Sequence, residues 1–298
     1  MLNRRSLLGA ALWPLAAAAA APLTEFQVAG SRLELQFDDS FGDALRHDAQ
    51  TWAETSARAV AGYFGRFPLP AVELVLQAVD GAGVRQGVTY AEPQPFVRLR
   101  LGRDTTPAQF RDDWVLVHEM VHLAIPRVAR AHNWLHEGIA TYVEGIARTQ
   151  AGLVPVRRLW IELAAALPQG QPREGDRGLD NTPTWARTYW GGAMFCLLAD
   201  VRLRERSGNR AGLQHALQGV LAAGGSYAVA WPVTRILATA DAAVGQTTLT
   251  DLYEQMKDSP VSIDLPALWR ELGIAGTRLL DDAPQAAVRR AIATARNE

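Results

Sequence analysis

The sequence contains a single cysteine, Cys196, so no disulfide can form within the chain. This cysteine falls in an apolar stretch, which predicts a buried packing role and not a reactive thiol. The chain also lacks an excess of basic residues, since its formal net charge is −1. Without a basic field, the sequence gives no reason to expect nucleic acid or an anionic membrane surface as a partner.

Long apolar runs are missing after residue 21, so no membrane span is predicted in the mature chain. The first 21 residues instead have the basic start, apolar alanine-rich middle and small-residue end of a secretory signal peptide. The pair Arg4-Arg5 resembles a twin-arginine signal, which carries folded proteins. We expect cleavage near Ala20 or Ala21, with retention as an uncleaved anchor left open by Pro22. The predicted location is periplasmic or secreted.

The composition, 48% apolar and 20% charged, is that of a globular protein and argues against disorder. Strands are predicted at Glu25–Phe37, Ala71–Val79 and Phe96–Leu101, around a helix at Asp43–Phe64. Phe96–Leu101 is expected to be the sheet edge, where an extended peptide could add by main-chain hydrogen bonds. After Pro126 helical patterns dominate, at Leu159–Leu167, Tyr189–Arg206, Ala211–Ala223 and Asp251–Met256.

The segment His118-Glu119-Met120-Val121-His122 has the pattern HExxH. Residues four apart share one helix face, so His118 and His122 can direct two imidazoles at one ion. Glu119 is rotated about a quarter turn away, where it can polarise a zinc-bound water without being a ligand. For the five residues alone, the alternative is a pair of core histidines beside a solvated acid.

The surrounding residues favour a helix. Thr105-Thr106-Pro107 offers a capping hydroxyl and a proline at the first helical position. Apolar residues then recur at close to helical spacing from Phe110 to Ile125, until Pro126 stops the run. One buried helix is therefore predicted between these two prolines.

A catalytic zinc site needs three protein ligands and one open position. The metzincin arrangement would place glycine and histidine three and six residues after His122, but Ile125 and Val128 stand there. That arrangement is excluded. A second amphipathic segment, residues 133–145, follows a short loop and carries Glu137 near its start.

Two further segments bear a family resemblance. WLHEGIATYVEG, which contains Glu137, resembles the WLNEGFASYVE segment of the gluzincin zinc metallopeptidases, the aminopeptidase N (M1) superfamily. YWGGA, beginning at Tyr189 and followed by LLADVRLRERSG, is similar to the YxKGA element of that superfamily, most of all in its M61 glycyl aminopeptidase branch. With HExxH, the resemblance covers roughly residues 114–208 in three ordered motifs. It implies that Glu137 is the third zinc ligand and that Tyr189 stabilises the oxyanion.

The resemblance also implies an α+β zincin fold of the thermolysin-like type. Such a fold has a small twisted sheet with an edge strand and a mainly helical C-terminal half. We accordingly expect a signal peptide at 1–21 and a catalytic domain at 22–298. The domain would divide into an α/β subdomain at 22–125, which carries the HExxH helix, and a helical subdomain at 126–298.

The sequence departs from the family pattern in three places. Gly191 stands where lysine is usual, and the segment between His122 and Glu137 is shorter than in the best-known aminopeptidases. The GxMEN strand motif is missing, and its nearest analogue is the stretch at residues 90–93. There Glu92 could anchor a substrate amine, the alternative being an ordinary surface acid at a turn.

Other polar residues near the motifs are weaker candidates. His132 and His136 flank Glu137 and are expected to be loop or supporting residues and not ligands. Thr141 and Glu144 share the helix face of Glu137 and could orient the zinc ligands, unless Glu144 only faces solvent. The remaining histidines that lack metal-like spacing are expected at the surface or in packing: His47 and His215.

The expected reaction is peptide-bond hydrolysis by a zinc-activated water. Glu119 would take the proton from that water and pass it to the leaving amine, while Tyr189 would donate to the oxyanion. One alternative is a non-catalytic, zinc-stabilised envelope binding protein, although no fourth structural ligand is evident. Another is a metal-independent protein with a decayed peptidase fold. Either an aminopeptidase or an endopeptidase fits the sequence.

Overall fold

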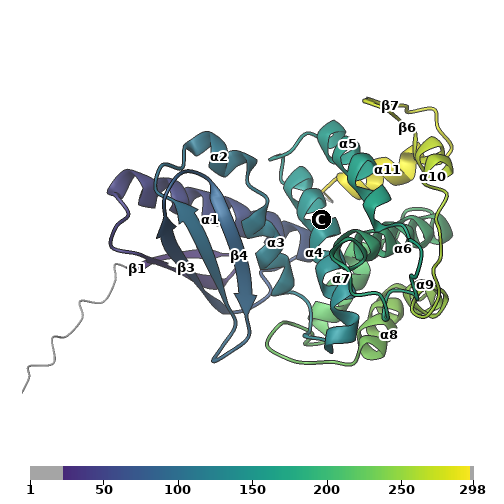
Figure 1. Cartoon of the computed structure of the whole chain (residues 1–298), viewed down its shortest axis with the longest axis horizontal. Helices are drawn as coiled ribbons and strands as arrows, with labels where there is room; N and C mark the ends of the chain where they lie inside the picture. The colour runs from purple at the N-terminus through teal and green to yellow at the C-terminus, as the bar shows by residue number, and fades with distance from the viewer. Residues whose placement is uncertain (1–22, 296–298) are drawn as a thin grey trace, which may run out of the picture.

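The computed structural model describes residues 23–295. The predicted signal peptide, 1–21, therefore lies outside the described residues. Figure 1 shows a sheet with helix α1 packed against it, a helical half beside the sheet, and helix α3 between the sheet and the helical half. A single continuous hydrophobic core runs through both halves. Among the described residues, no helix combines the length and apolar character that a membrane crossing requires.

The sheet has five strands in the order β1-β2-β3-β5-β4. β1 (Leu23–Val28) and β2 (Ser31–Phe37) form an antiparallel hairpin. β3 (Ala71–Val79) pairs in parallel with β2 and with β5 (Phe96–Gly102). β4 (Val84–Tyr90) pairs antiparallel with β5. The prediction of a mixed α and β architecture with a small sheet is thereby confirmed.

The prediction that Phe96–Leu101 forms the sheet edge is wrong, because β5 has a neighbour on each side and β4 is the edge. β4 was not predicted. Its sequence VRQGVTY contains one glycine and little apolar alternation, and most of its residues are only partly buried. Edge strands are commonly polar because one of their sides faces solvent. The polar residues of β4 interrupt the alternation of apolar and polar residues that is used to predict a strand from sequence.

Helix α1 (Asp43–Phe64) matches its predicted bounds and buries Trp52, Val60 and Phe64 on one face. The single helix predicted from Pro107 onward is instead two helices, α2 (Pro107–Asp112) and α3 (Val115–His122). Thr106 caps α2 as expected. The break falls at Asp113, as described below.

The C-terminal half is helical, as predicted, and wraps around α4 (Figure 1). Its α-helices are α4 (Asn133–Gln150), α5 (Val156–Ala166), α6 (Gly192–Ser207), α7 (Leu213–Ala222), α8 (Val233–Val244), α9 (Thr248–Met256), α10 (Leu265–Leu272) and α11 (Ala286–Ala293). Shorter pieces are η1 (Arg130–His132), η2 (Leu167–Gly170), the π-helical η3 (Arg187–Gly191), and the two-residue strands β6 (Ile274–Ala275) and β7 (Arg278–Leu279). Cys196 is buried in α6, as expected, and burial raises the pKa of its thiol.

Helices α4 and α6 cross with their backbones in direct contact. A Cβ atom on Gly138 would overlap the backbone of Gly192, and one on Gly192 would overlap the carbonyl oxygen of Trp134. Glycine is required at such a close approach because any side chain would force the helices apart. The crossing places η3, which leads into α6, beside the start of α4.

Candidate metal centre

The break at Asp113 starts a new helix and fixes its orientation. The backbone of Asp113 is extended, and its carboxylate accepts hydrogen bonds from the Leu116 amide (3.1 Å) and from Trp52 Nε1 on α1 (3.2 Å). A carboxylate in this position satisfies a free helix N-terminal amide. Helix α3 is thus tied to α1 and buries His118, Glu119 and His122 between the sheet and α4.

The structure brings His118, His122 and Glu137 together. The Nε2 atoms of both histidines lie 3.4 Å from Oε2 of Glu137, and the ligand atoms of all three residues lie within 4.8 Å of one another. Two ligands of a tetrahedral zinc ion, each about 2.0–2.1 Å from the metal, are separated by about 3.3 Å. The spacing therefore fits a shared metal ion.

The protonation state of the cluster suits a metal as well. Burial lowers the pKa of His118, with a smaller lowering from His122, so its imidazole is neutral near pH 7 and a nitrogen lone pair is free. Burial alone would raise the pKa of Glu137, but hydrogen bonds from the two histidines outweigh burial and hold it well below its usual range. Neutral imidazoles and an ionised carboxylate are the forms that bind divalent metals.

Glu119 is not one of the three clustered residues, and its carboxylate contacts the edge strand β4. The Thr89 hydroxyl lies 2.7 Å from Glu119 Oε2 and 2.9 Å from the Glu119 carbonyl oxygen, and it can donate its proton to either oxygen. A Cβ on Gly87 would stand 2.6 Å from Glu119 Cγ, so only glycine leaves room for the carboxylate there. Edge strand β4 therefore sets the position of Glu119. Neither Thr89 nor Gly87 was singled out by sequence, because β4 itself was not predicted.

Tyr189 lies on the π-helical turn η3, a type of distortion that is frequent at functional sites. Its ring lies 6.2 Å from that of His118 at an interplanar angle of 17°, and Trp185 stacks on its other side at 5.7 Å. Burial and the nearby carboxylates of Glu137 and Glu119 raise the pKa of Tyr189 to about 12. The hydroxyl therefore stays protonated and can donate a hydrogen bond into the site.

A second tyrosine, Tyr227, approaches from the loop after α7. Its hydroxyl donates to the Thr89 carbonyl oxygen at 3.3 Å. Burial raises the pKa of Tyr227, Arg127 lowers it, and the charges of Glu119 and Glu137 add to the increase. Sequence reasoning did not find this residue, because it lies in a loop without a motif and reaches the site only through the fold.

The other histidines and Glu92 lie outside the three-residue cluster. His136 is buried against His122, with ring centroids 4.4 Å apart, and burial lowers its pKa well below the usual value. His132 forms a hydrogen bond with Asp180 at 3.0 Å. The side chain of Glu92 is 77% exposed and forms an ion pair with Arg127 at 3.4 Å. His47 is exposed, and His215 Nδ1 accepts a hydrogen bond from the Gly212 amide.

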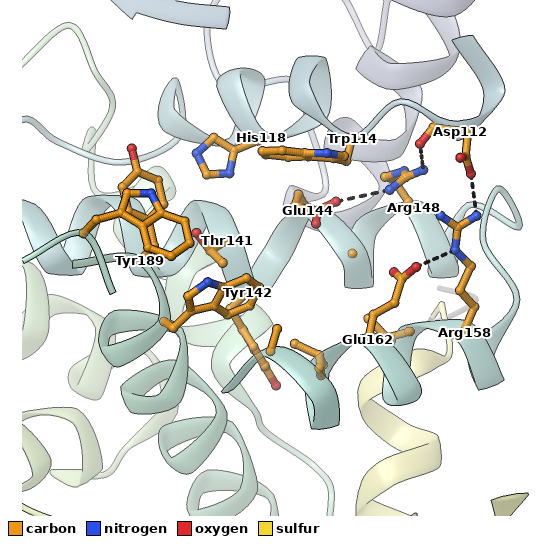
Figure 2. A pocket seen from close by; sticks show the side chains of 16 residues that line it. Asp112, Trp114, His118, Thr141, Tyr142, Glu144, Arg148, Arg158, Glu162 and Tyr189 are labelled. Atoms are coloured by element: carbon orange, nitrogen blue, oxygen red, sulfur yellow. Dashed lines mark hydrogen bonds and ion pairs between the residues drawn. The ribbon is translucent and has the colours of Figure 1, made fainter. Parts of the chain in front are cut away.

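Thr141 and Glu144 line a cavity of about 690 Å³ beside His118 (Figure 2). Glu144 neither contacts the metal cluster nor faces open solvent: it pairs with Arg148 at 3.5 Å, and its side chain is 18% exposed. Residues from α3, α4, α5 and η3 make up the wall, including Trp114, Leu159, Trp185, Tyr189 and Trp190. The metal cluster thus opens onto a side pocket.

Comparison with known proteins gives structural likeness only. No protein-family model matches the chain, and no curated protein matches its sequence. Among solved structures, an aminopeptidase N family protein from Idiomarina loihiensis superposes with a TM-score of 0.63 at 13% identity, over 85% of this chain and 49% of that one.

Two structures from Deinococcus radiodurans are also similar. Its M1 zinc metallopeptidase gives a TM-score of 0.52 at 16% identity, over 83% of this chain and 52% of that chain. A variant of the enzyme bound to a Tyr-Ser-Ala substrate gives 0.52 at 14% identity, over 82% and 53%. This chain spans about half the length of these neighbours. At this low identity the likeness is one of fold alone.

Proposed function

We propose that this protein is an exported zinc-dependent peptidase that hydrolyses peptide bonds. The observation that carries the proposal is the convergence of two imidazoles and one carboxylate, with each Nε2 atom 3.4 Å from Oε2 of Glu137 and a second carboxylate held beside them. Structural neighbours named as an aminopeptidase N family protein and as an M1 zinc metallopeptidase support it. Export rests on the signal-like residues 1–21, which lie outside the described residues.

In this proposal, His118, His122 and Glu137 would hold zinc, whose chemistry when bound is to acidify a water and to polarise a carbonyl. Glu119 takes the water proton at its carboxylate, which Thr89 holds in place. Glu119 then returns the proton to the leaving amine. Tyr189 donates a hydrogen bond to the carbonyl oxygen as negative charge develops on it.

The edge strand β4 gives the substrate a place to lie. Its outer side has no strand partner among the described residues, so an extended peptide can pair with it by main-chain hydrogen bonds. Gly87 and Thr89 of β4 pack directly on Glu119. A peptide on this edge would therefore have its backbone next to the proposed base.

The test is to purify the mature chain and to measure its zinc content and its hydrolysis of a mixed peptide library in one preparation. We expect one zinc per chain, with cleavage that a chelator stops and added zinc restores. Stoichiometric zinc without cleavage would favour the non-catalytic binding protein. A chain with neither zinc nor cleavage would be a decayed peptidase fold. Mapping the products from free and N-acetylated peptides would distinguish an aminopeptidase from an endopeptidase.

Replacing Tyr189 with phenylalanine should lower kcat by about 10²- to 10³-fold with little change in KM, because the hydrogen bond is made mainly in the transition state. Zinc content should stay unchanged. Tyr63→Phe is a matched control, since the buried Tyr63 hydroxyl has no hydrogen-bond partner among the described residues. A near-normal kcat for Tyr189→Phe would remove it from the mechanism and direct attention to Tyr227.

Replacing Thr89 with valine should lower kcat by about tenfold, because the isosteric side chain no longer donates to Glu119. Thr89→Ser keeps a hydroxyl and should restore most of the activity. Zinc content and circular dichroism spectra of both variants check that the fold is intact. Equal losses in valine and serine variants would mean that Thr89 contributes by packing alone.

A further inference from the structure

The side pocket extends from the metal cluster along α4. Glu137 and Glu144 lie seven residues apart on that helix, about 10 Å along its axis. Thr141 lies between them, and His118 and Tyr189 line the end nearest the metal cluster. Figure 2 shows Tyr189 on one side of the cavity and Arg148 and Arg158 on the other, with Glu144 between them. The pocket therefore suits a long side chain that enters beside the scissile bond.

Three tryptophan side chains line the side pocket. Trp114, 50% exposed, packs edge-on against His118 at 5.6 Å, and Trp185, 61% exposed, stacks on Tyr189. Trp190 completes this wall. Exposed apolar side chains that are grouped together mark interaction sites and ligand-binding grooves. Indole faces also attract cations and cover aliphatic side chains.

The charges at the far end are unequally paired. Arg158 contacts both Asp112 (2.5 Å) and Glu162 (2.6 Å), so these three groups satisfy one another. Glu144 has only the longer contact of 3.5 Å with Arg148, whose other nitrogen donates to the Asp112 carbonyl oxygen at 3.1 Å. Three carboxylates and two guanidiniums line the pocket, which gives it a net charge of −1, and Glu144 is the carboxylate with the longest contact to a guanidinium.

The Glu144 carboxylate is largely buried, and its contact with Arg148 is a long one. Burial raises its pKa to about 7, and Arg148 offsets this only in part. A buried carboxylate without a close partner is costly, and a cation brought to it removes that cost. A lysine side chain, about 6 Å long when extended, can span much of the distance from the metal cluster to Glu144.

The edge strand indicates which substrate residue would enter. The start of β4 lies toward the N-terminal end of α3, since Gly87 approaches Val115. Its other end lies toward the end of α3, where Glu92 pairs with Arg127. A peptide that pairs antiparallel with β4 would run toward Trp114 and the pocket. The residue after the scissile bond would then point into the pocket.

We propose that this pocket binds a basic side chain, lysine or arginine, of the residue immediately C-terminal to the cleaved bond. Glu144 receives the cation, and the indoles of Trp114 and Trp190 cover the aliphatic stem. This inference rests on the proposed peptidase function. It assigns Glu144 as the residue that determines specificity.

The test uses peptides Ala-Ala-Ala-Xaa-Ala-Ala in which Xaa is lysine, norleucine or glutamate, with products identified by mass spectrometry. The native enzyme should cleave the Ala-Lys bond with the highest kcat/KM and the Ala-Glu bond with the lowest. Glu144→Gln should reduce the lysine-to-norleucine ratio of kcat/KM by roughly 10- to 100-fold, the value of a charge-assisted hydrogen bond. Its kcat/KM for norleucine should remain close to native.

Glu162→Gln is the matched control, because it removes a carboxylate from the same pocket that Arg158 already pairs. It should change the lysine-to-norleucine ratio by less than about threefold. Equal effects of the two variants would mean that the general negative potential, and not Glu144, selects the substrate. A native preference for glutamate, or cleavage with lysine on the other side of the bond, would overturn the proposal.

A binding measurement separates this inference from the proposed function. The lysine and norleucine peptides are titrated against the Glu119→Gln protein, with the tryptophan fluorescence of the pocket as readout. Tighter binding of the lysine peptide, lost in the double variant with Glu144→Gln, would support the pocket assignment even if no peptide is hydrolysed. Equal binding of the two peptides would overturn it while leaving peptidase activity a separate question.

Discussion

Replacing Glu119 with glutamine is expected to lower kcat by roughly three to four orders of magnitude while zinc content stays at the native level. The amide cannot accept the proton of the attacking water or return it to the leaving amine. Its carbonyl oxygen can still accept the hydrogen bond from Thr89, so the side chain should keep its place. The measurement is single-turnover hydrolysis together with metal analysis of the same preparation.

Glu54→Gln on α1 is a suitable control for the glutamine substitution, because Glu54 pairs with Arg58 and lies outside the metal cluster and the side pocket. It should leave both zinc content and kcat unchanged. Turnover near the native rate in Glu119→Gln would end the proposed mechanism. Loss of zinc in that variant would instead mean that Glu119 supports the metal site.

Removing any one of the three proposed ligands should weaken zinc binding by more than the roughly 10- to 100-fold effect of losing a supporting group around a metal site. His118→Ala, His122→Ala and Glu137→Ala each leave two ligands where a catalytic zinc site requires three. Zinc content after dialysis, and competition with a chromogenic chelator, measure the loss. His47→Ala removes an exposed histidine and should bind zinc normally.

Glu137→Ala is the most informative of these variants because Glu137 was assigned by resemblance. Full zinc stoichiometry and native affinity in this variant would require another third ligand. Glu144 shares its helix face but pairs with Arg148 in the side pocket, so the structure gives it no direct access to the two histidines. Retention of zinc would therefore contradict the observed geometry as well as the family resemblance.

Elements whose residues alternate between buried and exposed positions were predicted closely from sequence. α1 and β3 have their predicted bounds because each buries one face and leaves the other partly accessible. β4 was missed because an edge strand carries little of that pattern. The helix break at Asp113 was missed because its apolar spacing continues across the break, while the cause is a tertiary contact with Trp52.

The residues of the candidate site also fall into those that the sequence predicted and those that only the structure revealed. His118, His122 and Glu137 were identified because their spacing or their neighbouring motif lies within a short stretch of sequence. Thr89 and Tyr227 were not, because each reaches the site from a distant segment that carries no motif. Local spacing can indicate which residues form a potential metal-binding cluster, whereas the residues that contact Glu119 depend on how the sheet packs against α3.

The glycine contact between α4 and α6 has a mechanical consequence. Two helices whose backbones touch cannot slide past one another without a steric clash, so Glu137 on α4 and Tyr189 on η3, which leads into α6, keep a fixed relative position. The two histidines and Glu119 belong to another, because α3 is tied to α1 and β4. A relative motion of these two groups would occur along the contact between α3 and α4, which separates His118 and His122 from Glu137.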